Sequence, residues 1–97
     1  MTETEESVRL QMSNSDVAAY FYKLADALEA KGELRFKVNA YRRAAKAMEQ
    51  EPRSVAALWQ AGELRSISGV GEAIEKKIGE ILTSGRLRAL DALVKED

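Results

Sequence analysis

Apolar residues recur every three or four positions along most of this chain, and that helical period is the feature that most limits its fold. In the first such segment they are Val17, Tyr20, Phe21, Leu24 and Leu28. This spacing places them on one face of an amphipathic helix. Ser15 is expected to cap the start of the helix and Gly32 to end it. Since no segment shows the alternation of a strand, the chain is expected to be all-α.

Four further helices follow from the same period and from glycine and proline punctuation. They are expected at residues 34–51, ended by Pro52, at 55–61, capped by Ser54 and ended by Gly62, at 71–84, ended by Gly85, and at 86–96. The expected core contacts in the last three are Leu58, Trp59, Ile74, Ile78, Ile81, Leu82, Leu87, Leu90 and Val94. We therefore predict a compact bundle of four short helices plus a C-terminal helix over residues 15–97. Residues 1–14 are expected to form a flexible acidic tail, or a short extra helix.

Composition removes several classes of function. The chain has 97 residues, enough for one small domain, and it contains no cysteine and no histidine. Disulfides and thiolate metal sites are thus excluded, and so is the usual general base of catalysis. No apolar run reaches the length that spans a membrane, and no secretory signal is visible. These features favour a cytoplasmic protein that binds no membrane.

A basic segment lies inside this nearly neutral chain, whose net charge is −1. Residues 34–46 carry five cations and no acid, namely Arg35, Lys37, Arg42, Arg43 and Lys46. A helical wheel with about 100° per residue places Leu34, Tyr41 and Met48 on the apolar face. Arg35, Asn39, Arg42 and Lys46 fall on the opposite side, with Arg43 just beyond, whereas Lys37 lies beside the apolar face. Such a cluster indicates a polyanion as partner, although a cluster of this kind alone is more often a solvated face.

The sequence "SISGVGEAIEKKIGEIL" places a glycine turn directly before a helix. It is not a dinucleotide loop, because Ile74 stands at the third glycine position and no strand precedes it, and a Walker A sequence is absent. Gly69 and Gly71 permit positive φ and remove side-chain bulk, so backbone N–H groups can face an anion. We predict a helix-hairpin-helix motif over about residues 54–84 that binds a DNA phosphate regardless of base sequence. The alternative is a plain turn between two packed helices.

The runs "FKVNAYRRAAKAM" and "ISGVGEAIEKKIGEILTSGRLRALDAL" together resemble the amino-terminal domain of family X DNA polymerases. The resemblance covers about residues 14–93. It implies a compact helical domain with a helix-hairpin-helix motif that binds gapped or single-stranded DNA and 5′ phosphates. In several members of the family this domain also excises 5′-deoxyribose phosphate with a Schiff-base lysine. The chain departs from the family pattern at Phe36, Ser68, Ala73 and Ala89, where a histidine, a proline and two lysines are found in the best-known member.

The resemblance also implies roles for individual residues. The Schiff-base lysine falls on Lys77, at the edge of the buried stripe of its helix, while Lys76 points away from that stripe. The 5′-phosphate pocket falls on Lys37, Tyr41 and Arg65, with Asn39 nearby. The basic residues expected to contact DNA are Arg42, Arg43, Lys46, Arg86 and Arg88. No cofactor is required, although K⁺ or Na⁺ is expected to bind the backbone carbonyls of Arg65, Ile67 and Val70.

Three functions remain open at this stage. The first is a sequence-independent DNA-binding module of repair or replication, either a separate protein or the first domain of a polymerase. The second is a 5′-deoxyribose-phosphate or abasic-site lyase that uses Lys77. The third is an interaction domain that has lost DNA binding. Polymerase chemistry needs clustered carboxylates that hold two metal ions, whereas the aspartates are scattered at Asp16, Asp26, Asp91 and Asp97.

Overall fold

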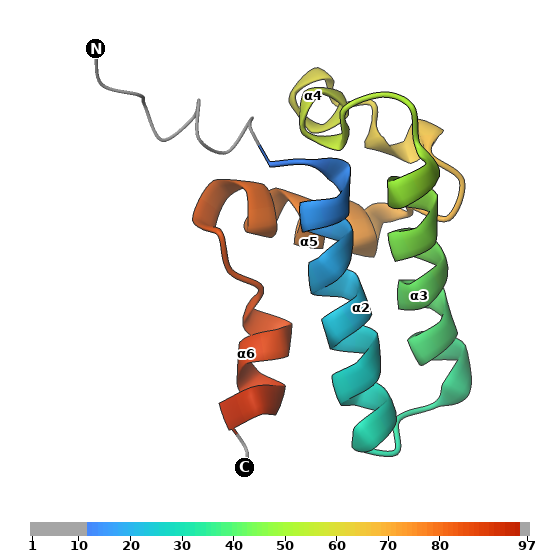
Figure 1. Cartoon of the computed structure of the whole chain (residues 1–97), viewed down its shortest axis with the longest axis vertical. Helices are drawn as coiled ribbons and strands as arrows, with labels where there is room; N and C mark the ends of the chain where they lie inside the picture. The colour runs from blue at the N-terminus through green and yellow to red at the C-terminus, as the bar shows by residue number, and fades with distance from the viewer. Residues whose placement is uncertain (1–11, 96–97) are drawn as a thin grey trace.

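A computed structural model of the chain describes residues 12–95, in which every regular element is a helix (Figure 1). The elements are α2 Asn14–Ala30, α3 Arg35–Gln50, α4 Val55–Ala61, the 3₁₀-helix η1 Leu64–Ser66, α5 Glu72–Ser84 and α6 Arg88–Lys95. The predicted all-helical bundle is confirmed for this part of the chain. The acidic tail predicted for residues 1–14, with its alternative of an extra helix, falls mostly outside the described residues. None of the helices in residues 12–95 has the length and apolar character needed to cross a membrane.

Helix α2 begins two residues earlier than the sequence analysis predicted. Ser13, not Ser15, is its N-cap, and the Asp16 N–H donates to the Ser13 hydroxyl at 3.0 Å. The Asp16 carboxylate in turn accepts from the Ser13 N–H at 3.1 Å, which completes a capping box. Ser15 cannot make this reciprocal pair, because Ala18 stands three residues after it.

The start of α2 is tied to the turn that joins α3 to α4. The Asn14 amide donates to the carbonyl oxygens of Glu51 and Arg53, at 3.1 and 2.8 Å. Its own carbonyl oxygen accepts from the Val55 N–H at 2.8 Å. These bonds satisfy backbone groups at the end of α3 and the start of α4, so one side chain fixes the relative positions of three helices.

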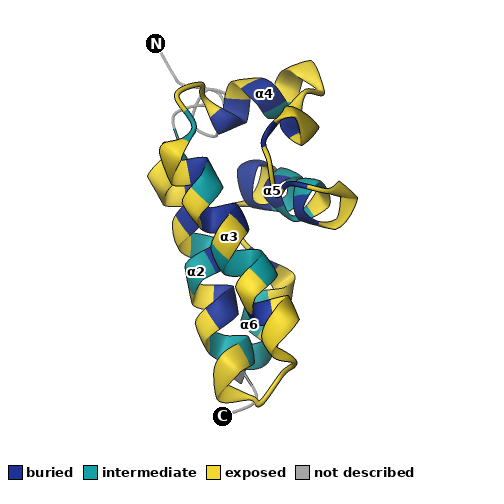
Figure 2. Cartoon of the chain, turned by 90° about the vertical axis from the view of Figure 1, so that its right-hand side faces the viewer, coloured by how far each residue is buried: buried dark blue, intermediate teal, exposed yellow. Residues whose placement is uncertain are grey.

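Helices α2 and α3 run side by side in opposite directions, and α4 and α5 cover one end of the pair (Figures 1 and 2). The largest side chains that are almost completely buried come from α2, α3, η1, α5 and the segment before α6. They include Phe21, Leu24, Met48, Leu64, Ile78, Ile81, Leu82 and Leu87. Nearly all of these positions follow from the helical period, so the predicted core is largely confirmed.

Two apolar residues that were expected in the core are exposed. Leu34 is 57% exposed and Val94 is 60% exposed. Leu34 is the N-cap of α3, so its side chain lies beyond the packed length of that helix. Val94 is in the last turn of α6, where it faces an open groove against α2 rather than a closed core.

Helix α4, η1 and α5 form the predicted helix-hairpin-helix unit. Ser54 caps α4 by accepting a hydrogen bond from the Ala57 N–H at 3.2 Å, and Gly62, with φ of 72°, ends the helix. Trp59 of α4 packs so closely on α5 that a Cβ added at Gly79 would lie 3.0 Å from its indole nitrogen. A glycine at this point of α5 therefore allows the two helices of the motif to approach each other.

Candidate nucleic-acid interface

The hairpin before α5 is a tight turn held by two buried side chains. Ile67 and Val70 are 4% and 6% exposed, and the Val70 N–H donates to the Ile67 carbonyl at 3.1 Å. Gly69 lies between them with φ of 91°, the conformation that the third residue of a type II turn requires. Ser68 and Gly69 thus point outward while the turn itself is anchored in the core.

Gly71, unlike Gly69, does not use the positive φ that a glycine permits. Its φ is −101° and its ψ is −170°, an extended conformation that any residue can adopt. A Cβ built on Gly71 would also meet no atom within 4 Å. Nothing in the fold itself therefore demands glycine here, so the missing side chain matters only to a molecule that approaches from outside.

Gly71 is the N-cap of α5 and supplies no side-chain hydrogen bond to the helix. The N–H groups of Glu72, Ala73 and Ile74 precede the first intrahelical bond, in which the Glu75 N–H donates to the Gly71 carbonyl at 2.9 Å. Such uncapped N–H groups, together with the helix dipole, attract anions. In α2 and α4 a serine side chain accepts a hydrogen bond from an N–H group of the first turn, whereas in α5 no N-cap side chain does so.

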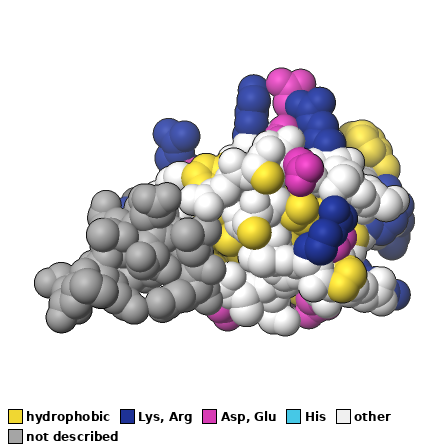
Figure 3. Space-filling model, turned by 90° about the horizontal axis from the view of Figure 1, so that it is seen from above, with side chains coloured by type: hydrophobic (Ala, Val, Ile, Leu, Met, Phe, Trp, Pro, Cys, Tyr) yellow, Lys and Arg dark blue, Asp and Glu magenta, His cyan; other side chains and the backbone are white. Residues whose placement is uncertain are grey.

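Carboxylates surround this open helix end. Glu72 and Glu75 occupy the first turn of α5, and both face Arg65 of η1. The Arg65 Nε lies 3.1 Å from Glu75, and its Nη2 lies 3.9 Å from Glu72. Arg65, predicted as a phosphate ligand, is thus already paired within the protein. Figure 3 shows that cationic and acidic side chains also lie beside each other on the face seen from above in Figure 1.

A pocket of about 350 Å³ lies between α3 and the start of α5. Two predicted phosphate ligands, Lys37 and Tyr41, line it together with Ala73 and Ile74 of α5. Ala73 also belongs to the uncapped first turn of α5, so the pocket continues into that helix end. The Lys37 Nζ lies 3.8 Å from Glu33, an ion pair within one turn of the chain.

Lys77 lies beside this pocket on the aromatic face of Tyr41. Its Nζ is 5.8 Å from the ring centre, and the Tyr41 ring stacks on Phe21 with centroids 6.2 Å apart. Lys77 is half-buried, whereas the exposed Lys76 points to solvent and lies 3.7 Å from Glu72. The predicted contrast between the two lysines is confirmed as a matter of geometry; the catalytic role of Lys77 stays a prediction.

Arg42 lies at the seam between α2 and α3 rather than on the outer side of α3. Its Nη2 is 2.9 Å from Asp26 and 2.9 Å from Glu29, both on α2. The hydrogen bond from Arg42 lowers the pKa of Glu29, and the two carboxylates raise the pKa of Arg42. Asn39, Arg43 and Lys46 are exposed on the outer side of α3, as the wheel predicted.

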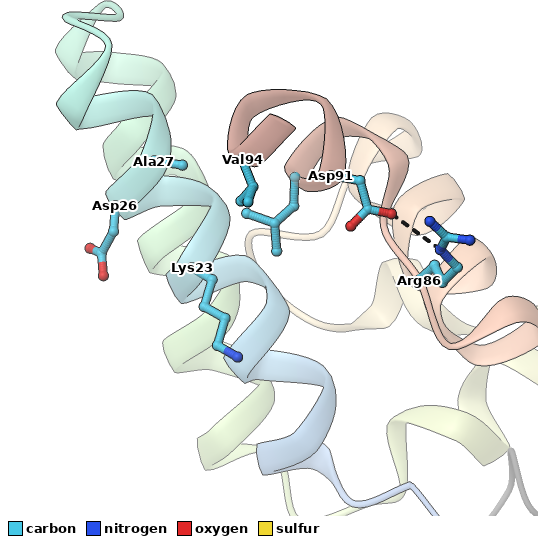
Figure 4. Close-up of a pocket in the computed structure, with 7 residues that line it drawn as sticks. Lys23, Asp26, Ala27, Arg86, Asp91 and Val94 are labelled. Carbon is cyan, nitrogen blue, oxygen red and sulfur yellow. Dashed lines mark hydrogen bonds and ion pairs between the residues drawn. The ribbon is translucent and has the colours of Figure 1, made fainter. Parts of the chain in front are cut away.

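The cations that follow α5 are also paired. Arg88 lies 3.0 Å from Glu80 of α5, and its backbone N–H donates to the same carboxylate at 2.9 Å. The Arg86 Nε lies 3.2 Å from Asp91, as Figure 4 shows. Arg86 and Asp91 border a groove of about 490 Å³ between α2 and α6 that Lys23 also lines. This groove is separate from the pocket at Tyr41.

No cluster of three or more acidic residues suited to a metal ion occurs in the part of the chain that the structure describes. A monovalent cation at the hairpin would instead use backbone carbonyls, and Arg65, Ile67 and Val70 remain the predicted ligands. The Ile67 carbonyl already accepts the Val70 N–H, which leaves it one lone pair for such an ion.

The structure therefore divides the predicted site residues among several surfaces. Lys37, Tyr41 and Lys77 come together at one pocket, whereas the remaining cations lie on the outer side of α3, on η1 and after α5. Sequence reasoning missed Phe36 and Ile74 as pocket-lining residues, together with the carboxylates that pair with the cations. Among described residues these carboxylates are Asp26, Glu29, Glu33, Glu72, Glu75, Glu80 and Asp91. Only the pairs four residues apart, such as Glu33 with Lys37, carry a local sequence signal.

Comparison with known proteins agrees with this geometry. The helix-hairpin-helix domain family matches residues 12–87. The chain is also 34% identical over 85 residues to the DNA polymerase/3′-5′ exonuclease PolX of Bacillus subtilis (strain 168), which confirms the resemblance to family X polymerases. That alignment covers 88% of this chain but only 14% of the relative. No solved structure matches the chain significantly. Because the family match extends over most of the chain and includes the hairpin and its two helices, the chain belongs to the helix-hairpin-helix domain family.

Proposed function

We propose that this domain binds DNA independently of base sequence, in repair or replication, with a preference for gapped or single-stranded DNA that carries a 5′ phosphate. The observation that carries this proposal is the continuity between the uncapped start of α5 and the pocket at Tyr41, which share Ala73. The family and the relationship to a bacterial polymerase support a DNA partner.

In this proposal a backbone phosphate approaches α5 over Gly71, where no side chain intervenes. The N–H groups of the first turn donate hydrogen bonds to the phosphate oxygens, and the helix dipole adds to the attraction. A terminal 5′ phosphate enters the pocket next to Lys37 and Tyr41. Because every DNA strand presents the same phosphates, these contacts fix the position of the DNA without reading its sequence.

The ion pairs around the site set the conditions under which DNA binds. A phosphate that binds Lys37 or Arg65 has to compete with Glu33 or with Glu72 and Glu75. Such exposed ion pairs contribute only about 0–1 kcal/mol each, so phosphate can displace them. Binding should weaken as the salt concentration rises, because salt screens the attraction between these cations and the phosphates. A K⁺ or Na⁺ ion at the hairpin carbonyls would offset the local acidity and bridge to the phosphate.

Fluorescence anisotropy with matched oligonucleotides tests this proposal. The gapped duplex with a 5′ phosphate should bind more tightly than the same duplex with a 5′ hydroxyl, and blunt duplex should bind more weakly than either. Lys37→Gln should reduce the preference for the 5′ phosphate. Lys76→Gln, which removes the same charge from an exposed position, should not. Equal and negligible binding of all three DNAs at low salt would overturn the proposal and favour an interaction domain without DNA affinity.

A lyase activity is a second candidate, and the position of Lys77 favours it. Its amine lies half-buried at the edge of the pocket, held over the Tyr41 ring. In this reaction the neutral amine attacks C1′ of an abasic sugar, and loss of water gives an imine. Removal of a C2′ proton then expels the 3′ phosphate by β-elimination, and water releases the sugar. With or without the lyase activity, we propose that the domain binds DNA. It would act together with a polymerase catalytic domain, in the same chain or in another.

Borohydride trapping decides whether this second activity is present. Reduction of the imine should link the protein covalently to an abasic oligonucleotide, and the adduct should disappear in Lys77→Ala but persist in Lys76→Ala. Absence of an adduct in the parent protein, measured with DNA that the protein binds, would exclude the lyase and leave the DNA-binding proposal intact.

A further inference from the structure

The outer side of α3 carries a continuous row of long polar side chains. The row consists of Arg35, Asn39, Arg43, Lys46 and Gln50, all exposed. With about 100° per residue these positions fall within an arc of about 80°. With a rise of 1.5 Å per residue they extend over roughly 22 Å of helix. No acidic residue lies within this arc.

The three cations of the row, of which Arg43 and Lys46 were predicted to contact DNA, differ from the remaining predicted DNA-contacting cations. Within residues 12–94 no ion pair is recorded for Arg35, Arg43 or Lys46. In contrast, carboxylates lie within 4.0 Å of Lys37, Arg42, Arg65, Arg86 and Arg88. A phosphate that meets the row therefore displaces only counterions, and not a carboxylate of the protein.

The acidic residues nearest to the row are engaged elsewhere. Both oxygens of Glu29 accept hydrogen bonds from Arg42, which is the main cause of the lowered pKa of Glu29, and the charge of Arg35 adds a smaller lowering. The carboxylate of Glu49 accepts a hydrogen bond from the Tyr22 hydroxyl at 2.8 Å, toward α2. These contacts draw the negative charge to the seam between α2 and α3 and leave the outer side of α3 positive.

The row faces away from Tyr41, the aromatic residue of the pocket. Arg43 and Tyr41 are two residues apart, so their side chains leave α3 in directions that differ by about 160°. Tyr41 faces Phe21 and Lys77, whereas Arg43 is exposed on the other side of a helix that measures about 10–12 Å across with its side chains. Tyr41 and Arg43 therefore lie on opposite sides of α3, and the edge of the pocket meets the edge of the row at Phe36.

We propose that the outer side of α3 binds the phosphate backbone of a second, double-stranded segment of DNA, separate from the strand at the hairpin. This inference rests on the proposed DNA binding and adds a second contact surface to it. A straight row of cations on a rigid helix suits the regular phosphates of a duplex. The row lacks an aromatic residue on which the bases of a single strand would stack. Phe36, which is 66% exposed, borders the row and lines the pocket, so an aromatic surface is present at the edge of the row and not within it.

The test compares two double variants with the same loss of charge. Arg43→Gln/Lys46→Gln removes the centre of the row, and Lys23→Gln/Arg53→Gln removes two exposed cations from α2 and from the turn before α4. Affinity is measured against salt concentration for a gapped DNA with long duplex arms and for a short 5′-phosphorylated single strand. For the gapped DNA, the row variant should lower the slope of log K against log salt by about 1.8, or 0.9 for each lost contact. Its affinity for the short single strand should stay within twofold of the parent.

The outcomes separate this inference from the proposed function. If both variants bind the gapped DNA with the slope of the parent protein, the row has no such role, while DNA binding through the hairpin stands. If the row variant loses affinity equally for the single strand, the row belongs to the hairpin site and the second segment is excluded. If the parent protein binds neither DNA, the proposed function fails and the row proposal with it. Circular dichroism and thermal melting confirm that each variant is folded.

Discussion

The Nζ atom of Lys77 lies 5.8 Å from the centre of the Tyr41 ring and joins α5 to α3 beside the pocket. This contact places an ammonium group on the negative face of an aromatic ring, where attraction contributes about 0.5–1 kcal/mol at partly exposed sites. The same ring stacks on Phe21 in the core. Tyr41 thus connects the core to the amine that the candidate lyase reaction would use.

A double-mutant cycle measures this contact. Tyr41→Leu and Lys77→Met should each lower the free energy of unfolding, but together they should lower it by about 0.5–1 kcal/mol less than the sum, because either change alone already removes the contact. Urea unfolding followed by circular dichroism provides the four values. As a control, Tyr41→Phe keeps the ring and should keep the coupling to Lys77. A coupling energy of zero would show that the two groups do not interact in solution.

The two hairpin glycines should respond differently to substitution. Gly69 has positive φ, so Gly69→Ala should destabilise the fold by about 1 kcal/mol or more. Gly71 is extended, has no neighbour near a built Cβ and is an N-cap, so Gly71→Ser should leave stability unchanged or raise it by a few tenths of a kcal/mol.

The same Gly71→Ser variant should nevertheless bind DNA more weakly, since its side chain enters the space through which a phosphate approaches α5. Thermal melting and anisotropy on one preparation give both readings. If Gly71→Ser binds gapped DNA as tightly as the parent protein, the phosphate does not approach over this residue.

The indole of Trp59 lies close to Gly79 and opposes a larger residue at that position. A Cβ at position 79 would lie 3.0 Å from the indole nitrogen, closer than packed atoms normally approach. Alanine is also the better helix former by about 1 kcal/mol, so the two effects oppose each other in Gly79→Ala. In a Trp59→Leu background the substitution should stabilise the protein by about that amount, whereas in the parent it should stabilise less or destabilise. Equal effects in both backgrounds would show that Trp59 does not limit the approach of α4 to α5.

Helices α2 and α6 show which structural features can be missed when only the sequence pattern is considered. The capping box at Ser13 and Asp16 is a local signal that was present in the sequence, and the choice of Ser15 overlooked it. The exposure of Val94 has no such signal, because it depends on how far α6 stays in contact with α2. The pairing of Arg42 with Asp26 and Glu29 joins residues more than ten positions apart, so only the packed fold reveals it.

The site shows a similar division. Lys77 and Tyr41 follow from the period and the family resemblance, since each occupies the edge of a buried stripe. The extended conformation of Gly71 was not predictable from its glycine identity, which permits almost any φ. The charge balance near the hairpin depends on where flexible side chains meet, and for that reason the sequence did not reveal that Arg65 is paired with Glu72 and Glu75.

The contrast between Leu87 and Val94 tests the position of α6. Leu87 is 1% exposed, so Leu87→Ala should lower the free energy of unfolding by about 2–5 kcal/mol. Val94 is 60% exposed, and Val94→Ala should change it by less than about 0.5 kcal/mol. Urea midpoints of the two variants provide the comparison. A large loss in Val94→Ala would show that α6 packs more deeply in solution, as the helical period alone had indicated.

Acid should weaken the seam between α2 and α3 through Glu29. The hydrogen bond from Arg42 holds the pKa of Glu29 below its ordinary value of 4.5 in the folded protein, whereas the unfolded chain keeps that ordinary value. A carboxyl with a lowered folded-state pKa contributes stability that is present above the unfolded pKa and is lost as pH falls through the folded pKa. Stability should therefore be level near neutral pH, where the chain has no histidine to titrate, and should fall in the range below about 4.5.

The Arg42→Gln variant isolates this contribution. The variant should be less stable than the parent protein at neutral pH, and the difference should shrink as pH falls. The reason is that acid protonates Glu29 and so removes from the parent protein the ion pair with Arg42 that the variant already lacks. Both proteins should still lose some stability at low pH, since Arg53 lowers the pKa of Glu51 independently of Arg42. Urea unfolding at a series of pH values between about 2.5 and 7 measures both curves. Parallel curves would mean that Glu29 titrates alike in the folded and unfolded chains, contrary to the ion pair with Arg42.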